Sequence, residues 1–587
     1  MNHHFQNKAR KRTLILTLFL SLWFCGIVLR LIHLQVFSYS RLRAEVLEQN
    51  QNNRAILPRR GTIFDRHGKI LARSIPAQSV FYIPFKKEPV ESQMQTILQL
   101  KEILDLSEKD LERIKSRLEK RDHFIWIKRK VDPDKWTTVK SLGLSGIFAQ
   151  EENKRFYPMG TLAAHILGGV NIDDQGTSGV EFKYNPILQG KKGQAIILRD
   201  AKKRTYNLEV IKEAERGKDI ILTIDETIQY IAQKELEKAV LENNASWGTV
   251  IISHPPSGNI LAMASFPTYD PNEYPPPAPE LEINRGIRHN FEPGSTFKMI
   301  TASAALENHS IGLSDTFDCR EGVIRVAGRP IRDHNKFKIL SFPEVFIHSS
   351  NIGTIQVGQK IGENSLYETI LTFGFARKTG VGLPGEESGI LLPLKSWSRR
   401  SLASVSIGYE ISVTAIQILQ AMNVIANRGI LVPPKIVKRV LGSSQRLDEG
   451  AGDKKRILSE RTASELVSIL ERVVLEGTGQ TAQVNGYTIA GKTGTTQKYD
   501  PEIGTYSSLK HLASFVGFTP VDKPALSIII VLDEPKKSAY YGGQVAAPVF
   551  RNISSKVLRY LHIYPQKKQL PGLITAKIWR ENDHEAQ

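Results

Sequence analysis

Residues 291–298 read FEPGSTFK, so Ser295 follows a Pro-Gly turn and Lys298 comes three residues later. Serine is a common helix N-cap, because its oxygen accepts hydrogen bonds from the first backbone N–H groups of the helix. The same spacing places a hydroxyl and an amine on one helix face, where the amine could deprotonate a nucleophilic serine. The stretch alone therefore predicts either a plain helix start or a catalytic serine with its base.

The Ser-x-x-Lys spacing is not unique in this chain, because YSSLK repeats it at Ser507 and Lys510. A catalytic serine needs more than a nearby base: it also needs a proton route and donors for the oxyanion. The neighbouring motifs and their order along the chain must therefore decide which serine is the nucleophile.

Two later stretches offer the missing groups. HSSNIGT, residues 348–354, places a hydroxyl and a carboxamide two residues apart, at Ser349 and Asn351. TIAGKTGTTQK, residues 488–498, follows a strand pattern and predicts a β-strand edge that a substrate backbone could lie against. The candidate substrate-binding residues on this edge are Lys492, Thr493, Gly494 and Thr495.

Both of these motifs also have a second copy. Residues 257–259 repeat Ser-x-Asn, but they belong to the PPSG hairpin turn. Residues 378–380 repeat Lys-Thr-Gly, but they precede a Gly/Pro-rich loop instead of following a strand. Ser507 comes after Lys492, in a predicted loop, and is therefore out of order. The order Ser-x-x-Lys, Ser-x-Asn, Lys-Thr-Gly selects the copies that begin at residues 295, 349 and 492.

Composition restricts the class of protein. The chain has 587 residues, of which 41% are hydrophobic and 24% charged, so two or three folded units are expected and not disorder. The net charge of +19 favours an anionic partner. No zinc finger, RNP-type or helix-turn-helix signature is present, so a nucleic acid is not the expected partner. The two cysteines, Cys25 and Cys319, give no disulfide framework, and no metal or cofactor motif is found.

The N-terminus predicts a membrane anchor. KARKR, residues 8–12, precedes an uncharged run over residues 13–29, and apolar character continues to residue 36. A cleaved signal peptide is the alternative, but the run is long and no A-x-A-like site follows. The positive residues stay on the cytoplasmic side. We therefore expect a cytoplasmic tail over 1–12, a single-pass anchor over 13–36 and an exported remainder.

The exported part divides into two folded units. Residues 37–220 begin with a polar, helical-looking stalk over 37–57 and contain the motifs RGTIFDRHGK and TSGVE. A second unit, 221–565, mixes strands and helices without regular βαβ alternation, which predicts an α+β or α/β sandwich with an antiparallel sheet. Its first helix is expected to be capped at Thr223 or Asp225 and to run to about residue 243. Residues 566–587 form a polar tail.

The three ordered motifs resemble those of penicillin-binding proteins and serine β-lactamases. Further blocks along nearly the whole chain resemble class B penicillin-binding proteins, above all the division-specific (FtsI-type) transpeptidase. These blocks are RGTIFDRHGKILA, TSGVEFKYNPILQG, ILAMASFPTYDPN, NRGIRHNFEPGSTFK, SIGYEISVTAIQ, ASFVGFTP and YYGGQVAAPVF. The resemblance implies a pedestal (dimerisation-like) domain over 37–220 and, over 221–565, a penicillin-binding, β-lactamase-like domain whose central antiparallel sheet is flanked by helices.

The resemblance also implies roles in the acylation step. Ser295 would attack the penultimate D-Ala carbonyl of a peptidoglycan stem peptide, and Lys298 would take its proton. Because a free lysine has a pKa of about 10.4, burial and a nearby cation such as Lys492 must keep Lys298 neutral. Ser349 would relay the proton to the departing D-Ala, and Asn351 would hold a substrate amide.

The residues around Lys492 would bind the substrate. By the same resemblance, Lys492, Thr493 and Thr495 would receive the carboxylate of the substrate or of a β-lactam. The backbone N–H groups of Ser295 and Thr495 would form the oxyanion hole. Gly294 is expected to serve the tight entry into the helix and not the chemistry.

The implied function is serine acyl-enzyme D,D-transpeptidation at the division septum of the bacterial cytoplasmic membrane. Implied partners are stem peptides, β-lactams, the inner membrane, a membrane glycosyltransferase and other division proteins. Alternatives are an elongation-type class B transpeptidase and a D,D-carboxypeptidase or β-lactamase. No deacylating E-x-x-L-N motif lies between residues 351 and 492, which disfavours a class A β-lactamase. A signalling receptor would need a larger cytoplasmic domain, and no glycosyltransferase block is seen in 37–220.

Overall fold

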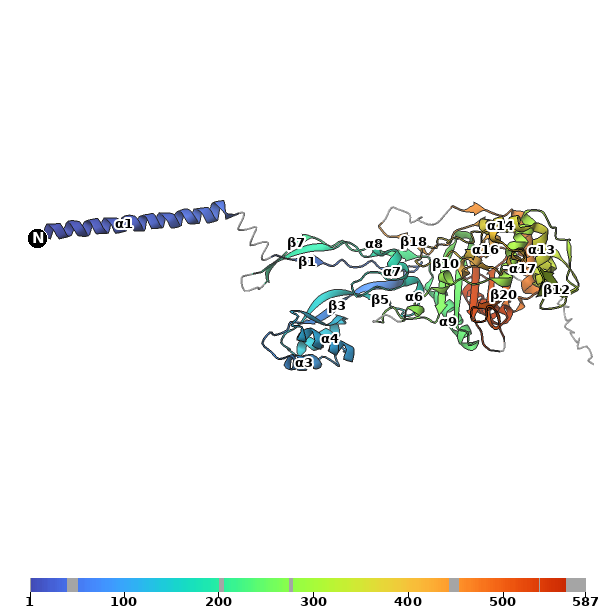
Figure 1. The fold of residues 1–587 in the computed structure, drawn as a ribbon, viewed down its shortest axis with the longest axis horizontal. Coiled ribbons are helices and arrows are strands. Elements are labelled where there is room, and N and C mark those ends of the chain that lie inside the picture. Colours follow the sequence, from blue (N-terminus) through green and yellow to red (C-terminus); the bar gives the residue numbers. More distant parts are fainter. Residues whose placement is uncertain are drawn as a thin grey trace, which may run out of the picture. The chain divides into compact units, whose positions relative to one another are not determined.

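A computed structural model describes residues 2–39, 51–199, 205–273, 278–442, 453–537 and 539–565. The chain forms two compact units. The first comprises residues 1–59 and 190–217, and the second comprises residues 60–189 and 218–587. Figure 1 labels helices and strands of both units where there is room.

The first unit contains the apolar helix and a small sheet. Helix α1 (Asn2–Ile32) continues into a π-helical turn (His33–Phe37), and the span Arg10–Phe37 is long and apolar enough to cross a membrane. Its 28 residues extend about 42 Å, against a hydrocarbon core of about 30 Å. The sheet is antiparallel, in the order β1 (Gln51–Ile56), β6 (Gly193–Arg199), β7 (Thr205–Lys212).

The prediction of a helical stalk over 37–57 is wrong for residues 51–56, because these residues form strand β1. Residues 40–50 lie outside the described residues. Strand β1 pairs with β6, and Gln51 lies opposite Leu198. A polar stretch whose partner lies more than a hundred residues away carries no local sign of strand formation, and tertiary pairing overrides its propensity.

The second unit begins with a small α/β part. Its strands are β3 (Ile70–Tyr82), β4 (Ile125–Val131) and β5 (Ile147–Phe156). Packed with these strands are helices α3 (Val90–Leu98), α4 (Glu108–Glu119) and α5 (Pro133–Ser141). The Ser107 hydroxyl caps α4 and Asp110 completes the capping box. Strand β2 (Ile63–Phe64) also pairs with β8 (Ile220–Leu222), which pairs with β18 (Val437–Val440). The sheet thus joins segments that are hundreds of residues apart.

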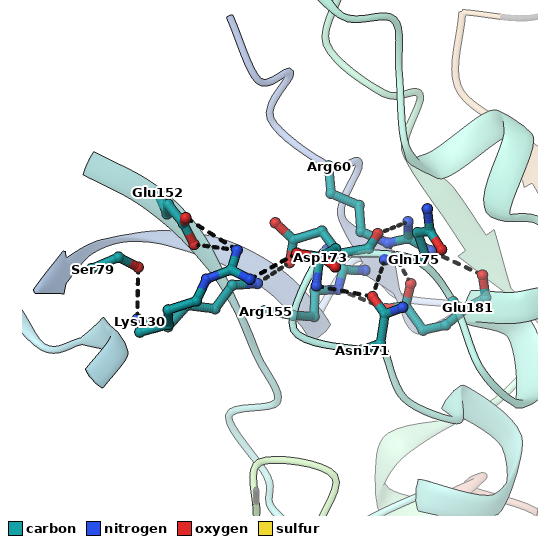
Figure 2. A network of polar contacts seen from close by, with 12 residues as sticks. Arg60, Ser79, Lys130, Glu152, Arg155, Asn171, Asp173, Gln175 and Glu181 are labelled. Atoms are coloured by element: carbon teal, nitrogen blue, oxygen red, sulfur yellow. Dashed lines mark hydrogen bonds and ion pairs between the residues drawn. The ribbon is translucent and has the colours of Figure 1, made fainter. Parts of the chain in front are cut away.

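The motifs RGTIF and TSGVE meet at a buried ion-pair cluster (Figure 2). Glu181, in α7 (Gly179–Lys183), accepts from Arg60 Nε at 2.6 Å and from Arg155 Nε, in β5, at 2.6 Å. Glu181 and Arg60 are shielded from solvent over the whole residue. The Arg155 side chain also donates to Gly61 O at 2.7 Å. Both arginines and the glutamate are almost fully buried, so these motifs hold three chain segments together.

A five-stranded antiparallel sheet forms the centre of the second unit, in the order β10-β9-β22-β21-β20. Its strands are β9 (Trp247–His254), β10 (Asn259–Phe266), β20 (Ala490–Asp500), β21 (Thr505–Thr519) and β22 (Leu526–Asp533). Strand β22 is buried throughout because both of its faces are covered. Ile528 and Ile530 pack in the core that includes α9 (Glu226–Glu242) and α19 (Ala547–Tyr560), whereas Ile529 packs in the opposite core.

The helices on that opposite face include α11 (Lys298–Glu307), α16 (Ala415–Ala426) and α17 (Glu460–Leu475). The remaining helices of this part are short or lie around the site. They are α6 (Ala164–Leu167), α8 (Asn185–Leu188), α10 (Arg285–Arg288), α12 (Phe342–Ile347), α13 (Asn351–Ile361), α14 (Glu363–Thr372), α15 (Ser401–Ser406) and α18 (Gly542–Val545). The six-stranded sheet, the helices and the central sheet confirm the predicted α+β class.

The predicted cap and end of the first helix after residue 221 are also confirmed. The Asp225 carboxylate caps α9 by accepting from Thr227 N and Ile228 N, and the helix ends at Glu242. The PPSG stretch forms the turn between β9 and β10. YSSLK is different: it was expected in a loop, but residues 505–519 are strand β21, which extends the hairpin with β20 beyond the rest of the sheet.

Two short two-stranded sheets lie near the site on the helical side. Strand β11 (Thr316–Asp318) pairs with β14 (Ile339–Ser341), and β12 (Val323–Val326) pairs with β13 (Arg329–Arg332). The other two are β15 (Ile390–Leu391) with β16 (Ile411–Ser412), and β17 (Ile430–Leu431) with β19 (Lys455–Arg456). The β12–β13 hairpin leads directly into the residues before α12.

Candidate active site

Ser295 lies in a one-turn 3₁₀ helix, Gly294–Thr296, that leads into α11. Gly294 has φ +52°, and a Cβ there would lie 2.4 Å from Thr496 Oγ1 on β20. Only glycine allows this close approach without strain. The Pro-Gly turn therefore presses the serine turn against the strand that carries the Lys-Thr-Gly motif, and Ser295 is left half-buried.

Lys298 is fully buried one turn after Ser295. Its Nζ donates to Ser349 O at 2.7 Å, to Asn351 Oδ1 at 2.8 Å and to Ser349 Oγ at 3.3 Å. In the described part of the chain it makes no hydrogen bond to Ser295, although catalytic hydrogen bonds often form only in the substrate complex. Burial, and then the positive charge of Lys492, hold the pKa of Lys298 well below its usual value.

Ser349 lies between two lysines. Its Oγ accepts from Lys492 Nζ at 3.0 Å as well as from Lys298 Nζ, and its backbone is left-handed, with φ +57°. A non-glycine residue in this conformation is uncommon and is found preferentially at functional sites. Because its oxygen accepts from both amines, the Ser349 hydroxyl proton is free to be donated elsewhere. This arrangement suits a proton relay.

Lys492 is the second buried lysine, 1% exposed on β20. Besides Ser349, its Nζ donates to Thr493 O at 3.3 Å. Burial lowers the pKa of Lys492 to about 7. Both amines are therefore easier to deprotonate than a free lysine, and because they lie close together their titrations are coupled.

The rest of the Lys-Thr-Gly strand packs against neighbouring segments. Thr493 Oγ1 shares a hydrogen bond with Thr478 Oγ1 at 2.7 Å, and Thr495 Oγ1 accepts from Gly542 N at 2.9 Å. A Cβ at Gly494 would lie 2.3 Å from Ser514 Oγ and 2.8 Å from a Thr296 methyl. The sequence analysis explained Gly494 by the room it leaves for a substrate backbone. The structure adds that the turn carrying Ser295 packs into the space that a side chain at Gly494 would fill.

These residues surround a cavity of about 290 Å³, which we call the catalytic cavity. Ser295, Asn351 and Thr495 line it, whereas Lys298 and Lys492 lie beneath its lining. Aromatic side chains supply much of the wall: Tyr540 stacks on His511 at 4.1 Å and on Tyr541 at 4.4 Å between ring centroids. Residues of the wall that the sequence did not single out are Arg332, His334, Ile407, Tyr409, Gln497, His511, Tyr540 and Tyr541.

Asp333 fixes the Ser-x-Asn segment, and sequence reasoning missed it. One carboxylate oxygen accepts from Ser350 Oγ at 2.7 Å, and the other accepts from Asn351 N and from Ile352 N at 3.1 Å. A carboxylate on the first amides of α13 is favoured by the helix dipole. No local signal marks Asp333, since it lies 16 residues before Ser349 and reaches α13 only in the folded chain.

A second missed contact joins the nucleophile segment to the β20–β21 hairpin. Glu292 Oε1 accepts from Tyr506 OH at 2.9 Å and from Glu410 N at 2.9 Å. The Tyr506 ring also meets Tyr409 edge-on, with centroids 5.3 Å apart. Burial raises the pKa of Glu292. The hairpin that carries YSSLK therefore rests on the residues just before Ser295 and on the wall of the catalytic cavity.

The second copies of the motifs lie elsewhere. Ser507 is buried in β21, where its Oγ accepts from Leu509 N and Lys510 N, and Lys510 pairs with Asp500. Lys378 is exposed in the loop after α14. In the described part of the chain no group of three or more His, Cys, Asp or Glu side chains could hold a metal ion. The structure brings together the copies that the order of the motifs selects, those at residues 295, 349 and 492.

Two family models match the chain. The model of the penicillin binding protein transpeptidase domain matches residues 248–555, and that of the penicillin-binding protein dimerisation domain matches residues 55–222. Together they span the motifs RGTIF and TSGVE and the three motifs of the candidate active site.

Three curated relatives cover almost the whole chain. A probable peptidoglycan D,D-transpeptidase PenA of Neisseria meningitidis is 33% identical over 549 residues, 93% of this chain and 92% of the relative. Stage V sporulation protein D of Bacillus subtilis is 34% identical, over 96% of this chain and 88% of the relative. Peptidoglycan D,D-transpeptidase FtsI of Escherichia coli K12 is 31% identical, over 92% of each.

Solved structures agree. Penicillin binding protein 3 of Mycobacterium tuberculosis in complex with aztreonam has a TM-score of 0.67 at 27% identity, over 87% of this chain and 99% of that one. Penicillin binding protein 2X of Streptococcus thermophilus has a TM-score of 0.68 at 26% identity, over 86% and 80%.

Proposed function

This chain belongs to the class B penicillin-binding proteins and is a peptidoglycan D,D-transpeptidase, and from that premise we propose that it works through an acyl-enzyme on Ser295 at the division septum. One observation carries the assignment of the site. Two buried lysines from different elements, Lys298 and Lys492, both donate to Ser349 Oγ beneath the cavity that Ser295 lines.

Acylation begins with neutral Lys298. The Ser295 oxygen attacks the carbonyl carbon of the penultimate D-Ala while Lys298 takes its proton, and the new C–O bond gives a tetrahedral oxyanion. Backbone N–H groups of Ser295 and Thr495 stabilise that oxyanion. When the C–N bond breaks, the terminal D-Ala amine receives a proton through the Ser349 hydroxyl, which is bonded to both lysines. Free D-Ala leaves and an ester on Ser295 remains.

Deacylation repeats these steps with another nucleophile. An acceptor amine on a second stem peptide attacks the ester carbonyl and loses its proton to the Lys298–Ser349 pair. The C–O bond to Ser295 then breaks, Ser295 regains its proton, and an amide cross-link is the product. Asn351 holds a substrate amide, and Lys492 with Thr493 and Thr495 attracts the substrate carboxylate. A β-lactam enters the same first step, but its ring-opened acyl group stays attached to the enzyme.

The rest of the chain bears on where in the cell this reaction takes place. We propose a cytoplasmic tail over 1–12, an anchor over 13–36, a pedestal over 37–220 and a catalytic domain over 221–565 outside the membrane. The apolar span Arg10–Phe37 and the basic residues before it support the orientation. Relatives named for division and sporulation favour a septal role over an elongation role. Since the catalytic groups fit acyl transfer alone, a membrane glycosyltransferase supplies the glycan strands.

Labelling with a fluorescent penicillin tests the nucleophile. We expect Ser295→Ala to abolish labelling and to remove the adduct from the intact mass, because Ser295 lines the catalytic cavity one helical turn before the buried Lys298. Ser507→Ala and Ser508→Ala are matched controls from the second Ser-x-x-Lys copy and should label normally. A folded Ser295→Ala protein that still carries the drug would refute the assignment.

Reconstitution tests whether a separate polymerase supplies the glycan strands that this protein cross-links. Full-length protein given lipid-linked disaccharide precursor is expected to make no glycan polymer alone and to cross-link strands when a polymerase is added. Replacing residues 13–36 by an unrelated spanning helix should weaken that coupling, because helices pack specifically in the bilayer. Polymer made by this protein alone would contradict the proposal, and release of D-Ala without cross-links would favour a carboxypeptidase.

A further inference from the structure

A second cavity lies between the end of α19 and the segment that follows the 3₁₀ turn Gln480–Ala482. Its volume is about 610 Å³, against 290 Å³ for the catalytic cavity, and the two share no lining residue. Pockets of about 300–1,000 Å³ are typical of ligand sites. Because transpeptidation uses none of its residues, this distal basic cavity needs an explanation of its own.

The lining of the distal basic cavity carries positive charge and no carboxylate. Arg551 and Arg559 lie on α19 and His562 follows the helix; no lining residue is Asp or Glu. Eight residues of helix separate the arginines, which places them about 12 Å apart along the axis and about 80° apart around it. In the described part of the chain, neither guanidinium has a hydrogen-bond or ion-pair partner. Lys556, which does not line the cavity, is paired with Glu235.

The walls of the cavity are fixed by contacts within the fold. Tyr487 OH donates to Ile563 O at 2.7 Å, and a Cβ on Gly486 would lie 2.5 Å from the Pro565 ring. The two sides are therefore in direct contact. His562 has a left-handed backbone, with φ +54°, where a helix end usually has glycine. A ligand would meet a wall that is already formed.

The helix end does not use up the arginines. The last carbonyls of α19 accept from backbone amides: Leu561 N bonds Val557 O, His562 N bonds Arg559 O, and Ile563 N bonds Leu558 O. This local hydrogen bonding satisfies the carbonyls that a basic side chain would otherwise cap. Capping therefore does not account for Arg559, and its charge is available to a ligand.

We propose that the distal basic cavity binds an acidic peptide segment whose carboxylates pair with Arg551 and Arg559. The guanidinium fork pairs with a carboxylate through two parallel hydrogen bonds. In an extended peptide, residues four apart share a face and lie about 13 Å apart, close to the spacing of the two arginines. Tyr487 and the Ile563 side chain supply the apolar wall that peptide side chains pack on.

Other groups of the lining favour a peptide over a phosphate polymer. The Asn485 carboxamide and the Ser555 hydroxyl line the cavity and, among the described residues, have no partner, so they can bond a peptide backbone. A phosphate polymer would use the arginines and leave the amide and the tyrosine ring without a role.

The test measures binding of a fluorescein-labelled Glu-Ser repeat octapeptide to full-length protein by fluorescence anisotropy at low salt. We expect Arg551→Ala/Arg559→Ala to weaken binding at least tenfold, and Arg551→Lys/Arg559→Lys to recover part of it. The control Lys378→Ala/Arg399→Ala removes the same charge from exposed positions outside the cavity and should change binding less than twofold. Penicillin acylation of Ser295 should be unchanged in every variant, which separates this site from the proposed function and shows that the variants are folded.

Two outcomes would overturn the proposal. Equal loss of binding in the control would show a general effect of net charge. Tight, arginine-dependent binding of inorganic polyphosphate with no binding of the octapeptide would assign the cavity to a different class of ligand.

Discussion

Replacing Lys492 by glutamine should shift the pH dependence of acylation to higher pH. The Nζ atoms of Lys298 and Lys492 lie 3.3 and 3.0 Å from the same Ser349 oxygen, so they are at most about 6 Å apart. Two unit charges at that distance repel by about 3 kcal/mol at an effective dielectric constant of 20. Loss of the Lys492 charge should therefore raise the pKa of Lys298 toward its ordinary value.

The sign of the effect on rate follows from the role of Lys298. The base must be neutral, so acylation rises as pH increases through the pKa of Lys298. In Lys492→Gln the rise should come at higher pH, and a lost repulsion of about 3 kcal/mol corresponds to a fall of about 100-fold in the rate on the acidic limb. Lys492→Gln also loses the attraction between Lys492 and the carboxylate of the penicillin, which lowers the rate at every pH. Only a displacement of the pH profile therefore reports the effect of the Lys492 charge on Lys298.

The assay is the second-order rate constant for a fluorescent penicillin across pH 5–10, the enzyme being checked for folding by thermal unfolding. Lys378→Gln, in the second Lys-Thr-Gly copy, is the matched control because its side chain is exposed in a loop. It should keep the profile of the unmodified enzyme. A Lys492→Gln profile with an unshifted midpoint would refute the electrostatic reasoning, and equal rates for the two variants would refute the choice of motif.

The remaining predictions concern stability and topology. Lys492 has a pKa of about 7 when folded and about 10.5 when unfolded, so between these pH values the unfolded state binds more protons. The free energy of unfolding, measured by urea titration, should therefore rise from pH 7 to 10 more steeply in the unmodified chain than in Lys492→Gln. Glu181→Ala leaves Arg60 and Arg155 buried without their partner and should cost about 3–5 kcal/mol by the same measurement, whereas Glu476→Ala, in an exposed pair, should change little; equal effects would contradict a structural role. Gly294→Ala should lower the melting temperature and slow acylation, because it combines a positive φ with a Cβ 2.4 Å from Thr496; normal acylation would show that the turn can relax. Protease added to spheroplasts should degrade the catalytic domain, and full protection until lysis would reverse the proposed orientation.

The sequence by itself determined the features that depend on short stretches of chain. An uncharged run after KARKR is enough to predict a spanning helix, because the bilayer sets its length. The Asp225 cap and the PPSG turn were predicted because capping and turn formation involve only neighbouring residues. The order of the three motifs and the collinear blocks gave the family and its reaction, and the comparisons confirm both.

Sequence reasoning failed where a partner lies far along the chain. Residues 51–56 read as part of a polar helix but form a strand with residues that follow Lys192. YSSLK read as a loop but continues β21, because its partner on β20 holds it in register. Pairing energy comes from the partner strand, so the local pattern does not contain it.

Only the tertiary structure decided how the candidate groups meet. The sequence placed a lysine beside Ser295, yet the Lys298 amine points to Ser349 and Asn351, 51 and 53 residues away. Asp333 holds the Ser-x-Asn segment although nothing in its neighbouring residues marks it, and Glu181 of the TSGVE motif joins two buried arginines that lie far away in the sequence. Burial depends on every segment that packs around a group, so the lowered pKa values of both lysines, on which the proposed reaction depends, exist only in the folded chain.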